Sequence, residues 1–266
     1  MKDIVIFIST FGFRCIKVSN SIAIEVGAAN RNKFRYSLKD NTGINISKEN
    51  EYYGELTGLY WIWKNYDFKD IKYIGFCHYN KKLSINQRKA KKYLELNSES
   101  WVVSNSRRIP KHSDINEWKI FDEIIRVYYP EYYPSLIHLY NREGEGDKCN
   151  TANLFITSVS EFYKYCEFVF GVCDKLRTQI GDNDKIKFDK RYCAFLAERL
   201  LSVYLQKNER EYLEVPIMYS KRYLSIISNI LTWLHVDRNS RIYLRIRKKL
   251  DKWISTSSYK RKDNNE

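Results

Sequence analysis

A mostly parallel β-sheet flanked by helices, an α/β fold, is the fold class that this sequence predicts. Short apolar, β-branched runs alternate with longer segments of helical periodicity over residues 1–220. Apolar residues make up 44% and charged residues 29% of the 266, a composition typical of globular chains. With only 4 Pro and 10 Gly, no flexible linker stands out. We therefore expect one substantial core in residues 1–220.

The first elements are two strands and a loop. Ile4–Ile8 is a β-branched apolar run, which predicts a buried strand. Ile22–Gly27 predicts a second strand that stops at small residues. Asp40–Asn50 is polar and contains Asn-Thr-Gly, so we expect a loop in which Ser47 caps the next helix.

A helix, a strand and a basic excursion follow. Tyr52–Lys64 carries apolar residues at the i, i+3, i+4, i+7 spacing of a core-facing helix, with Trp61, Trp63 and Tyr60 interpreted as packing residues. Ile71–Cys77 predicts a buried strand. Gln87–Leu96 is basic and amphipathic, and we expect a surface helix or hairpin there.

The second half of the domain continues the alternation. Ile115–Val127 predicts a helix that ends before Pro130. The other predicted elements are strands at 101–104, 152–157 and 213–218, and helices at 159–177 and 190–207. In such parallel sheets, ligands bind beyond the carboxyl ends of the strands, where Gly27 and His78 lie in this sequence.

Signatures of several common enzyme classes are absent from the sequence. There is no Walker A, GxGxxG, HExxH or GxSxG segment. The six cysteines form no CxxC pair, and we interpret them as reduced, mostly buried thiols of a cytosolic protein. Asp182-Asn-Asp184 is interpreted as a turn between helices. We therefore predict no zinc site.

His78 and the residues after it, Tyr-Asn-Lys-Lys, have two interpretations. His78 is either a hydrogen-bonded histidine at the rim of the sheet, beside solvated lysines, or part of a cationic cluster for a diphosphate. Lysine is a good point-charge partner for phosphate, and imidazole can donate to it. Such a cluster would stabilise a departing nucleotide without a metal.

Two glutamates also have two interpretations each. Glu55 either caps its helix or points into the cleft. Glu198 either lies on a solvated face beside Arg199 or accepts a proton from an acceptor hydroxyl. The sequence by itself leaves both choices open.

Several segments together resemble a bacterial capsular and exopolysaccharide synthesis family, domain of unknown function 4422, which is grouped with glycosyltransferases of the GT-A fold. The matching segments are 40–47, Asn50, 55–65 (ELTGLYWIWKN), 75–79 (GFCHY), 129–132, 153–156 and 191–201. The resemblance implies a GT-A-like domain over residues 1–220. It also implies transfer of a sugar from a UDP-sugar donor, with galactose or galactofuranose favoured, to a lipid-linked glycan acceptor.

The resemblance also implies the residues of the site. Glu198 would be the catalytic base, and His78 would act beside it. The residues expected to bind the nucleotide sugar are Gly27, Ala28, Asp40, Asn45, Asn50, Glu55, Tyr79, Lys81, Lys82, Asn153 and Arg191. No DxD follows the strand at 71–77, where many such enzymes hold a metal, so we assign no metal ligands and leave Mn²⁺ or Mg²⁺ as an open cofactor.

The sequence departs from the family in one place. The family usually follows its His-Tyr with two arginines, whereas this chain has Asn80 and Lys81. Arginine binds phosphate in a fork and lysine does not. We therefore expect an altered donor affinity or donor identity.

The C-terminal segment carries much of the net charge of +14: residues 221–266 hold 12 Lys or Arg and 4 Asp or Glu. An apolar stripe marks residues 223–234, and residues 241–254 predict a basic amphipathic helix. We expect the tail at 221–254 to attach to an anionic membrane surface; the alternative is that it folds over the catalytic domain. We expect residues 255–266 to be disordered.

The N-terminal MKDIVIFISTFGF does not fit a signal peptide, and no run of 18 apolar residues occurs. We therefore expect a cytoplasmic protein, peripheral at the inner face of the plasma membrane.

Two further functions stay open on the sequence. A pI of about 9.3 and 22 tyrosines interleaved with lysines would suit a nucleic-acid-binding protein. No recognised nucleic-acid motif occurs, and the leading hypothesis expects no nucleic-acid partner. The third possibility is a non-catalytic scaffold of a polysaccharide synthesis complex, which would bind no sugar nucleotide.

Overall fold

The computed structural model describes residues 3–109, 116–140, 147–181 and 190–220. Our predictions for 221–254, 255–266 and the turn at 182–184 lie outside these residues.

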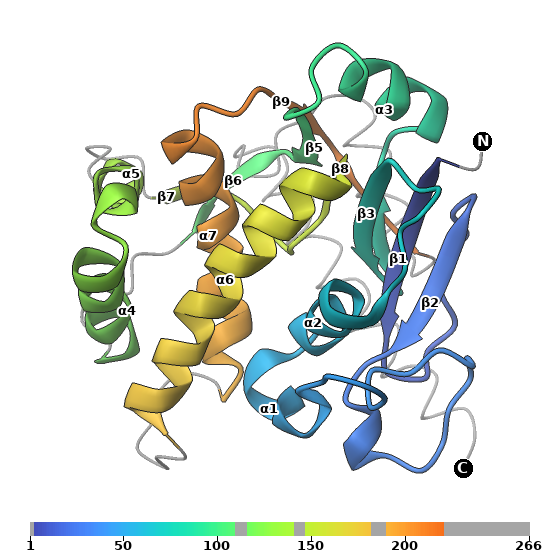
Figure 1. The fold of residues 1–266 in the computed structure, drawn as a ribbon, viewed down its shortest axis with the longest axis horizontal. Helices are drawn as coiled ribbons and strands as arrows, with labels where there is room; N and C mark the ends of the chain where they lie inside the picture. Colours follow the sequence, from blue (N-terminus) through green and yellow to red (C-terminus); the bar gives the residue numbers. More distant parts are fainter. Residues whose placement is uncertain (1–2, 110–115, 141–146, 182–189, 221–266) are drawn as a thin grey trace, which may run out of the picture.

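The core is an eight-stranded sheet with helices packed against it (Figure 1). Its strands are β1 (Ile4–Thr10), β2 (Ser21–Glu25), β3 (Tyr73–His78), β4 (Lys81–Leu83), β5 (Trp101–Ser104), β8 (Phe155–Ser158), β9 (Tyr212–Val215) and β10 (Ile217–Tyr219). The order β2-β1-β3-β8-β5-β9 is parallel except at β8, and β4 and β10 extend it antiparallel beside the end of β3. The predicted mostly parallel α/β sheet is confirmed.

The remaining elements surround this sheet. A separate two-stranded sheet pairs β6 (Ser106–Ile109) with β7 (Asp147–Asn150). The helices are α1 (Asn50–Tyr53), α2 (Leu56–Asn65), α3 (Gln87–Leu94), α4 (Asn116–Tyr128), α5 (Tyr133–Tyr140), α6 (Val159–Ile180) and α7 (Tyr192–Lys207). In the described ranges, short 3₁₀ turns lie at Ala28–Asn30, Ser47–Glu49 and Pro130–Tyr132.

Two predicted elements are split in the structure. The helix expected at 52–64 breaks into α1 and α2 at Gly54, whose φ of 52° suits glycine. The strand expected at 213–218 is interrupted at Pro216, which has no N–H to donate, so β9 pairs with β5 and β10 with β4. The elements β4, β6, β7 and α5 were not predicted.

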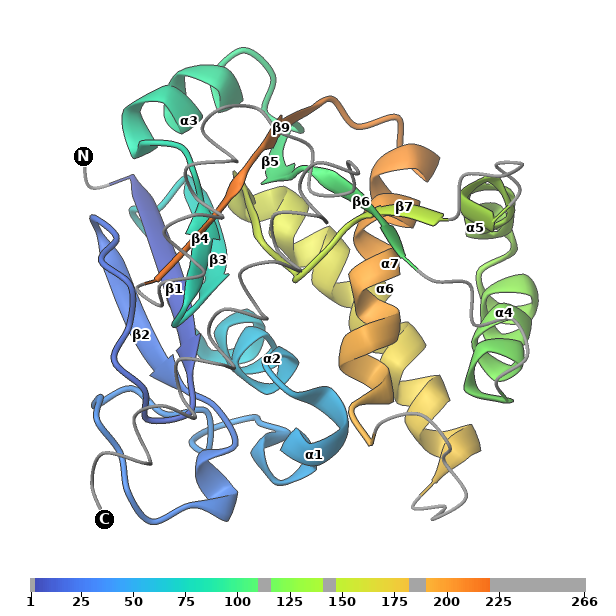
Figure 2. The ribbon, with the colours of Figure 1, turned by 180° about the vertical axis from the view of Figure 1, so that it is seen from behind.

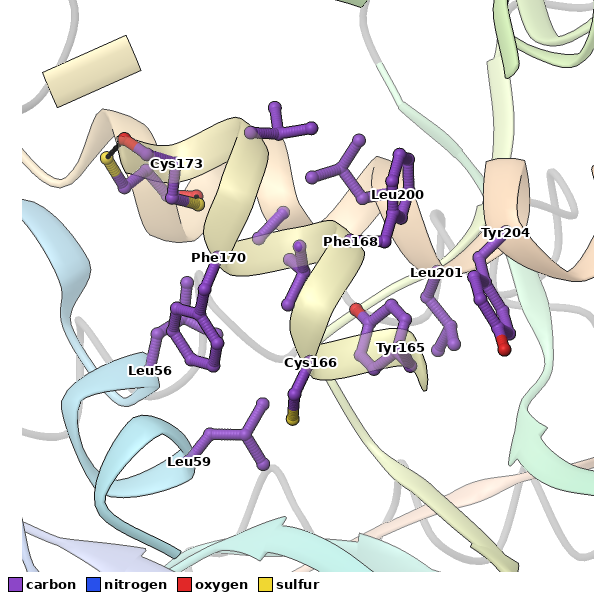
Figure 3. Close-up of a cluster of buried hydrophobic side chains, with 14 of the residues drawn as sticks. Leu56, Leu59, Tyr165, Cys166, Phe168, Phe170, Cys173, Leu200, Leu201 and Tyr204 are labelled. Atoms are coloured by element: carbon purple, nitrogen blue, oxygen red, sulfur yellow. Dashed lines mark hydrogen bonds between the residues drawn. The ribbon is translucent and has the colours of Figure 1, made fainter. Parts of the chain in front are cut away.

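The two faces of the sheet form separate apolar clusters, because side chains alternate along each strand. In β1, Val5 and Phe7 join the larger cluster, which contains residues of α2, α4, α6 and α7. Figure 3 shows side chains of α6 standing between Leu56 and Leu59 of α2 and Leu200 and Leu201 of α7. Ile4, Ile6 and Ile8 face the other way and join the second cluster.

None of the helices in the described part of the chain combines the length and apolar composition that crossing a bilayer requires.

A buried aspartate fixes the loop at the carboxyl end of β2. Asp40 is fully buried, and its carboxylate accepts hydrogen bonds from the backbone N–H groups of Gly27 at 2.8 Å and Ala28 at 2.9 Å. The Ser47 hydroxyl donates to the same carboxylate. Gly27 has a φ of 61°, and a Cβ there would clash with the Asn50 side chain. Asp40 therefore fixes the conformation of the loop at this end of the sheet.

The Asp40 contacts give a stability prediction. Asp40→Ala leaves two buried N–H groups without acceptors, and we expect the free energy of unfolding to fall by about 3 kcal/mol. Asp70→Ala, which removes an exposed aspartate in the turn before β3, is the matched control and should change it by less than about 0.5 kcal/mol. Urea denaturation measures both. Equal effects of the two substitutions would contradict this role for Asp40.

Candidate active site

The parallel strands β1, β2 and β3 have their carboxyl ends on the same side of the sheet, which we call the sheet edge. His78 is the last residue of β3. Glu55, immediately before α2, reaches the same edge, and its Oε1 lies 4.0 Å from His78 Nε2. The Glu55 side chain makes no capping hydrogen bond to its helix. Of the two interpretations that the sequence left open for Glu55, the structure favours the one in which it points into the site.

A turn between β7 and β8 contacts both residues. Asn153 Nδ2 donates to Glu55 Oε1 at 3.0 Å, and the carbonyl oxygen of Ala152 lies 2.6 Å from His78 Nε2. Ala152 and Asn153 both have left-handed backbone, with φ of 71° and 48°. Residues other than glycine adopt this conformation at a cost, and such residues cluster at functional sites. The turn thereby positions one acid and one histidine.

The contact with Ala152 determines the state of the His78 ring. A carbonyl oxygen only accepts hydrogen bonds, so Nε2 carries the proton, and Nδ1 is the lone-pair nitrogen of the neutral ring. Burial lowers the pKa of His78, although the negative charge of Glu55 opposes this. At neutral pH the 4.0 Å pair is therefore an uncharged imidazole beside a carboxylate.

This state differs from the expectation that His78 donates to a diphosphate as part of a cationic cluster. The Nε2 proton already belongs to the Ala152 carbonyl, and desolvation disfavours a second proton on Nδ1. A neutral His78 offers a hydrogen-bond acceptor to a ligand instead.

Glu198 adds a second carboxyl group from α7. Burial raises the pKa of Glu198, and the charge of Glu55 raises it further, while Lys81, Arg199 and Arg107 act in the opposite direction. Its side chain is half-buried rather than on a solvated face. A carboxyl group with a raised pKa is suited to proton transfer near neutral pH.

Three side chains from separate parts of the chain thus meet at the carboxyl end of the sheet, and Lys81 and Glu198 lie within electrostatic reach of them. We call this set the strand-end cluster: Glu55, His78, Lys81, Asn153 and Glu198. Its Lys81 pairs with His78 in the β3–β4 register and acts electrostatically on both His78 and Glu198.

Lys82, predicted beside Lys81, lies elsewhere. Successive residues of a strand point to opposite faces. Lys82 Nζ donates to the Lys17 carbonyl oxygen at 2.9 Å, away from the strand-end cluster. Tyr79 stacks on Phe13, with ring centroids 4.7 Å apart, and this places an aromatic pair where β1 and β3 end.

The residues predicted around the end of β2 bond mainly to the chain itself. Besides Asp40, Asn50 Nδ2 donates to the Gly54 carbonyl at 2.6 Å and to Thr57 Oγ1 at 2.9 Å. Asn45 is exposed, and its side chain bonds within its own turn, to Gly43 and Ser47. These contacts shape the loop, and a contact between these side chains and a nucleotide stays a prediction.

Arg191 lies just before α7 and is exposed, with its guanidinium 5.2 Å from the centre of the Phe195 ring. Gly54, at the break between α1 and α2, packs against the start of α7 beside Arg191. Arg191 is thus placed near the start of α2, and its role in binding stays a prediction.

Three residues near the site were not predicted: Phe13, Arg107 and Ala152. The aromatic Phe-Gly-Phe segment after β1 was a usable signal for Phe13, because it directly follows a buried strand. Arg107 belongs to β6, which was not predicted. No sequence signal marks an alanine that adopts left-handed backbone.

Within the ranges that the structure describes, no three His, Cys, Asp or Glu side chains form a group that could hold a metal ion.

Comparisons with known proteins agree with the predicted fold. A solved structure titled "WbbM bifunctional glycosytransferase apo structure" superimposes with a TM-score of 0.67 at 22% sequence identity. The match covers 83% of this chain but only 46% of that one. This likeness shows that the two chains share a fold. A search of curated proteins finds no match.

The sequence was also compared with protein families. The family described as a domain of unknown function (DUF4422) matches residues 11–209, a range that contains all of the strand-end cluster. Since the match spans well over half of the sequence, this chain belongs to the family of domain of unknown function 4422.

Proposed function

We propose that the chain is a glycosyltransferase that transfers a hexose, such as galactose or galactofuranose, from a UDP-sugar to a lipid-linked glycan in capsular or exopolysaccharide synthesis. The observation that carries the proposal is the strand-end cluster, in which Glu198, with its raised pKa, lies near Glu55 and Lys81 at the sheet edge. The fold shared with a structure titled as a glycosyltransferase supports it.

The proposed reaction assigns one role to each group. A hydroxyl oxygen of the acceptor attacks the anomeric carbon of the donor, and Glu198 accepts the hydroxyl proton. The bond from the anomeric carbon to the diphosphate breaks, and its electron pair leaves with UDP. Lys81 stabilises the negative charge that develops on the leaving group. His78 Nδ1 accepts a hydrogen bond from a substrate hydroxyl.

The binding roles follow the geometry of the sheet edge. The hydrogen bond of 3.0 Å from Asn153 Nδ2 to Glu55 Oε1 orients both side chains, and both face the sugar. Tyr79 and Arg191 flank the site. We assign the nucleoside to the end of β2, beside the Gly27–Ala28 turn. We also propose that the basic residues of 241–254 attach the protein to the cytoplasmic face of the membrane.

The first test replaces the base. Glu198→Gln keeps the shape of the side chain but cannot accept a proton, so turnover should fall at least about 100-fold. Calorimetry should show UDP affinity within a few-fold of the wild type. The control is Glu167→Gln, an exposed glutamate on α6, which should leave turnover unchanged. Unchanged turnover in Glu198→Gln would remove Glu198 from the mechanism.

The pH profile gives a second readout of the same assignment. A base must be unprotonated to act, so wild-type kcat/KM should decline as pH falls through the raised pKa of Glu198. Glu55→Gln removes the charge that helps to raise this pKa, so the decline should shift to lower pH. A shift to higher pH would show that Glu55 does not act on the base through its charge.

The two lysines after β3 form a matched pair. Lys81→Ala removes the cation of the strand-end cluster and should weaken UDP binding on the order of tenfold. Lys82→Ala removes an equal charge that contacts the Lys17 carbonyl, and should change UDP affinity by less than about twofold. Calorimetric titration with UDP measures both. Equal losses in the two variants would mean that overall charge, rather than this site, attracts the nucleotide.

A further inference from the structure

The two faces of the sheet are covered unequally in the described residues. Helices α2, α4, α6 and α7 pack on the larger cluster, whereas α3 is the helix that contributes to the second cluster, through Ala90 and Leu94. Figure 2 shows α3 near one end of the strands, at the top of the view, with β1 and β2 extending well below it.

A cavity of about 840 Å³ lies on this second face. Its lining combines polar residues, among them Lys17, Lys82 and Gln87, with apolar ones that include Ile6, Ile8, Val18, Ala23, Ile85 and Met218. Cys77 also lines it, while its neighbour His78 belongs to the strand-end cluster. Because side chains alternate along β3, the sheet separates this cavity from the candidate active site.

The described chain ends beside this cavity. Met218 of β10 lines it, and the Ser220 N–H donates to the Asn80 carbonyl oxygen at 2.9 Å, which fixes where the tail begins. Forty-six residues follow, at 221–266. The tail therefore starts within a few residues of a cavity that is more apolar than polar.

The first part of the tail has the composition of a buried helix. Residues 223–236 (YLSIISNILTWLHV) contain no Lys, Arg, Asp or Glu. An uncharged apolar run of this length is more typical of a core helix than of a membrane span. As a helix it would be about 21 Å long, enough to cross about four strands. Lys221 and Arg222 precede it, and the other ten Lys and Arg residues of the tail follow it, from Arg238 onward.

We propose that residues 223–236 form a helix whose apolar stripe packs into this cavity and covers the second face of the sheet. The basic segment 241–254 is then held at the surface, available to an anionic membrane. This inference goes beyond the proposed function, because it concerns how the tail is attached and holds whichever reaction the site performs.

Cys15 provides a built-in probe of this packing. It lines the cavity and is half-buried, whereas the other five cysteines are buried. In the full chain, N-ethylmaleimide should label Cys15 slowly. Ile227→Asp combined with Ile230→Asp places two charges in the stripe and should accelerate labelling on the order of tenfold, as local opening exposes the thiol. Mass spectrometry of the modified peptides measures the rate.

The matched control is Ser225→Asp combined with Thr232→Asp, which adds the same charge on the opposite side of the predicted helix. It should label Cys15 at the wild-type rate. The four buried cysteines outside the cavity report on folding, since they should stay unlabelled in every variant: Cys149, Cys166, Cys173 and Cys193. If they react in the stripe variant, the milder Ile230→Asn replaces it.

Vesicles of anionic phospholipid separate this proposal from membrane insertion of the stripe. We expect the stripe variant to show faster labelling of Cys15 even without vesicles. The triple variant Lys248→Glu, Lys249→Glu and Lys252→Glu should no longer bind vesicles, but its Cys15 should stay protected. Equal labelling of Cys15 in the wild type and the stripe variant would overturn the proposal. So would loss of vesicle binding in the stripe variant with unchanged Cys15 labelling.

Discussion

Two successive left-handed residues, Ala152 and Asn153, hold the candidate active site together. The carbonyl of the first accepts the Nε2 proton of His78, and the amide of the second donates to Glu55. Each non-glycine residue in this conformation costs on the order of 1 kcal/mol. The turn leads directly into β8, which is paired on both sides by β3 and β5. The central sheet thus maintains a turn that the local sequence disfavours.

The electrostatics of the site follow from that turn. His78 keeps one proton on Nε2 and stays neutral, so the positive charge of the strand-end cluster comes from Lys81. Glu55 keeps its place through Asn153, and its negative charge raises the pKa of Glu198 across the site. A cation and a carboxyl group of raised pKa are suited to the two roles that the proposed reaction assigns, leaving-group stabilisation and proton acceptance.

Because side chains alternate along each strand, the two faces of the sheet carry different features: the strand-end cluster on one and the cavity on the other. Lys81 and His78 belong to the strand-end cluster, whereas Lys82 and Cys77 line the cavity on the opposite face. The candidate active site and the cavity proposed to bind the tail therefore lie on opposite faces of the same sheet. Changes to the tail should reach the active site only through the sheet.

The sequence predicts much of this framework, because strand and helix periodicity are local properties. The ends of β2 and β3 are predicted to within two residues, which suffices to place Gly27 and His78 at the carboxyl end of the sheet. Gly54 is itself a sequence signal for the break between α1 and α2. The helical spacing of the residues after it favoured one continuous helix instead. The directions of Lys81 and Lys82 depend on β4, whose three residues pair with distant β10 and show no pattern of their own. The left-handed Ala152 and the burial of Asp40 arise from contacts far along the chain, which no local pattern reveals.

The state of His78 tests this account most directly. Nitrogen chemical shifts of the His78 ring, followed by NMR over a pH titration of the resting protein, report which nitrogen carries a proton. The account predicts a neutral ring protonated at Nε2 at pH 7, with a pKa below the ordinary value of 6.5. A ring protonated on both nitrogens at pH 7, or a neutral ring protonated at Nδ1, would contradict it.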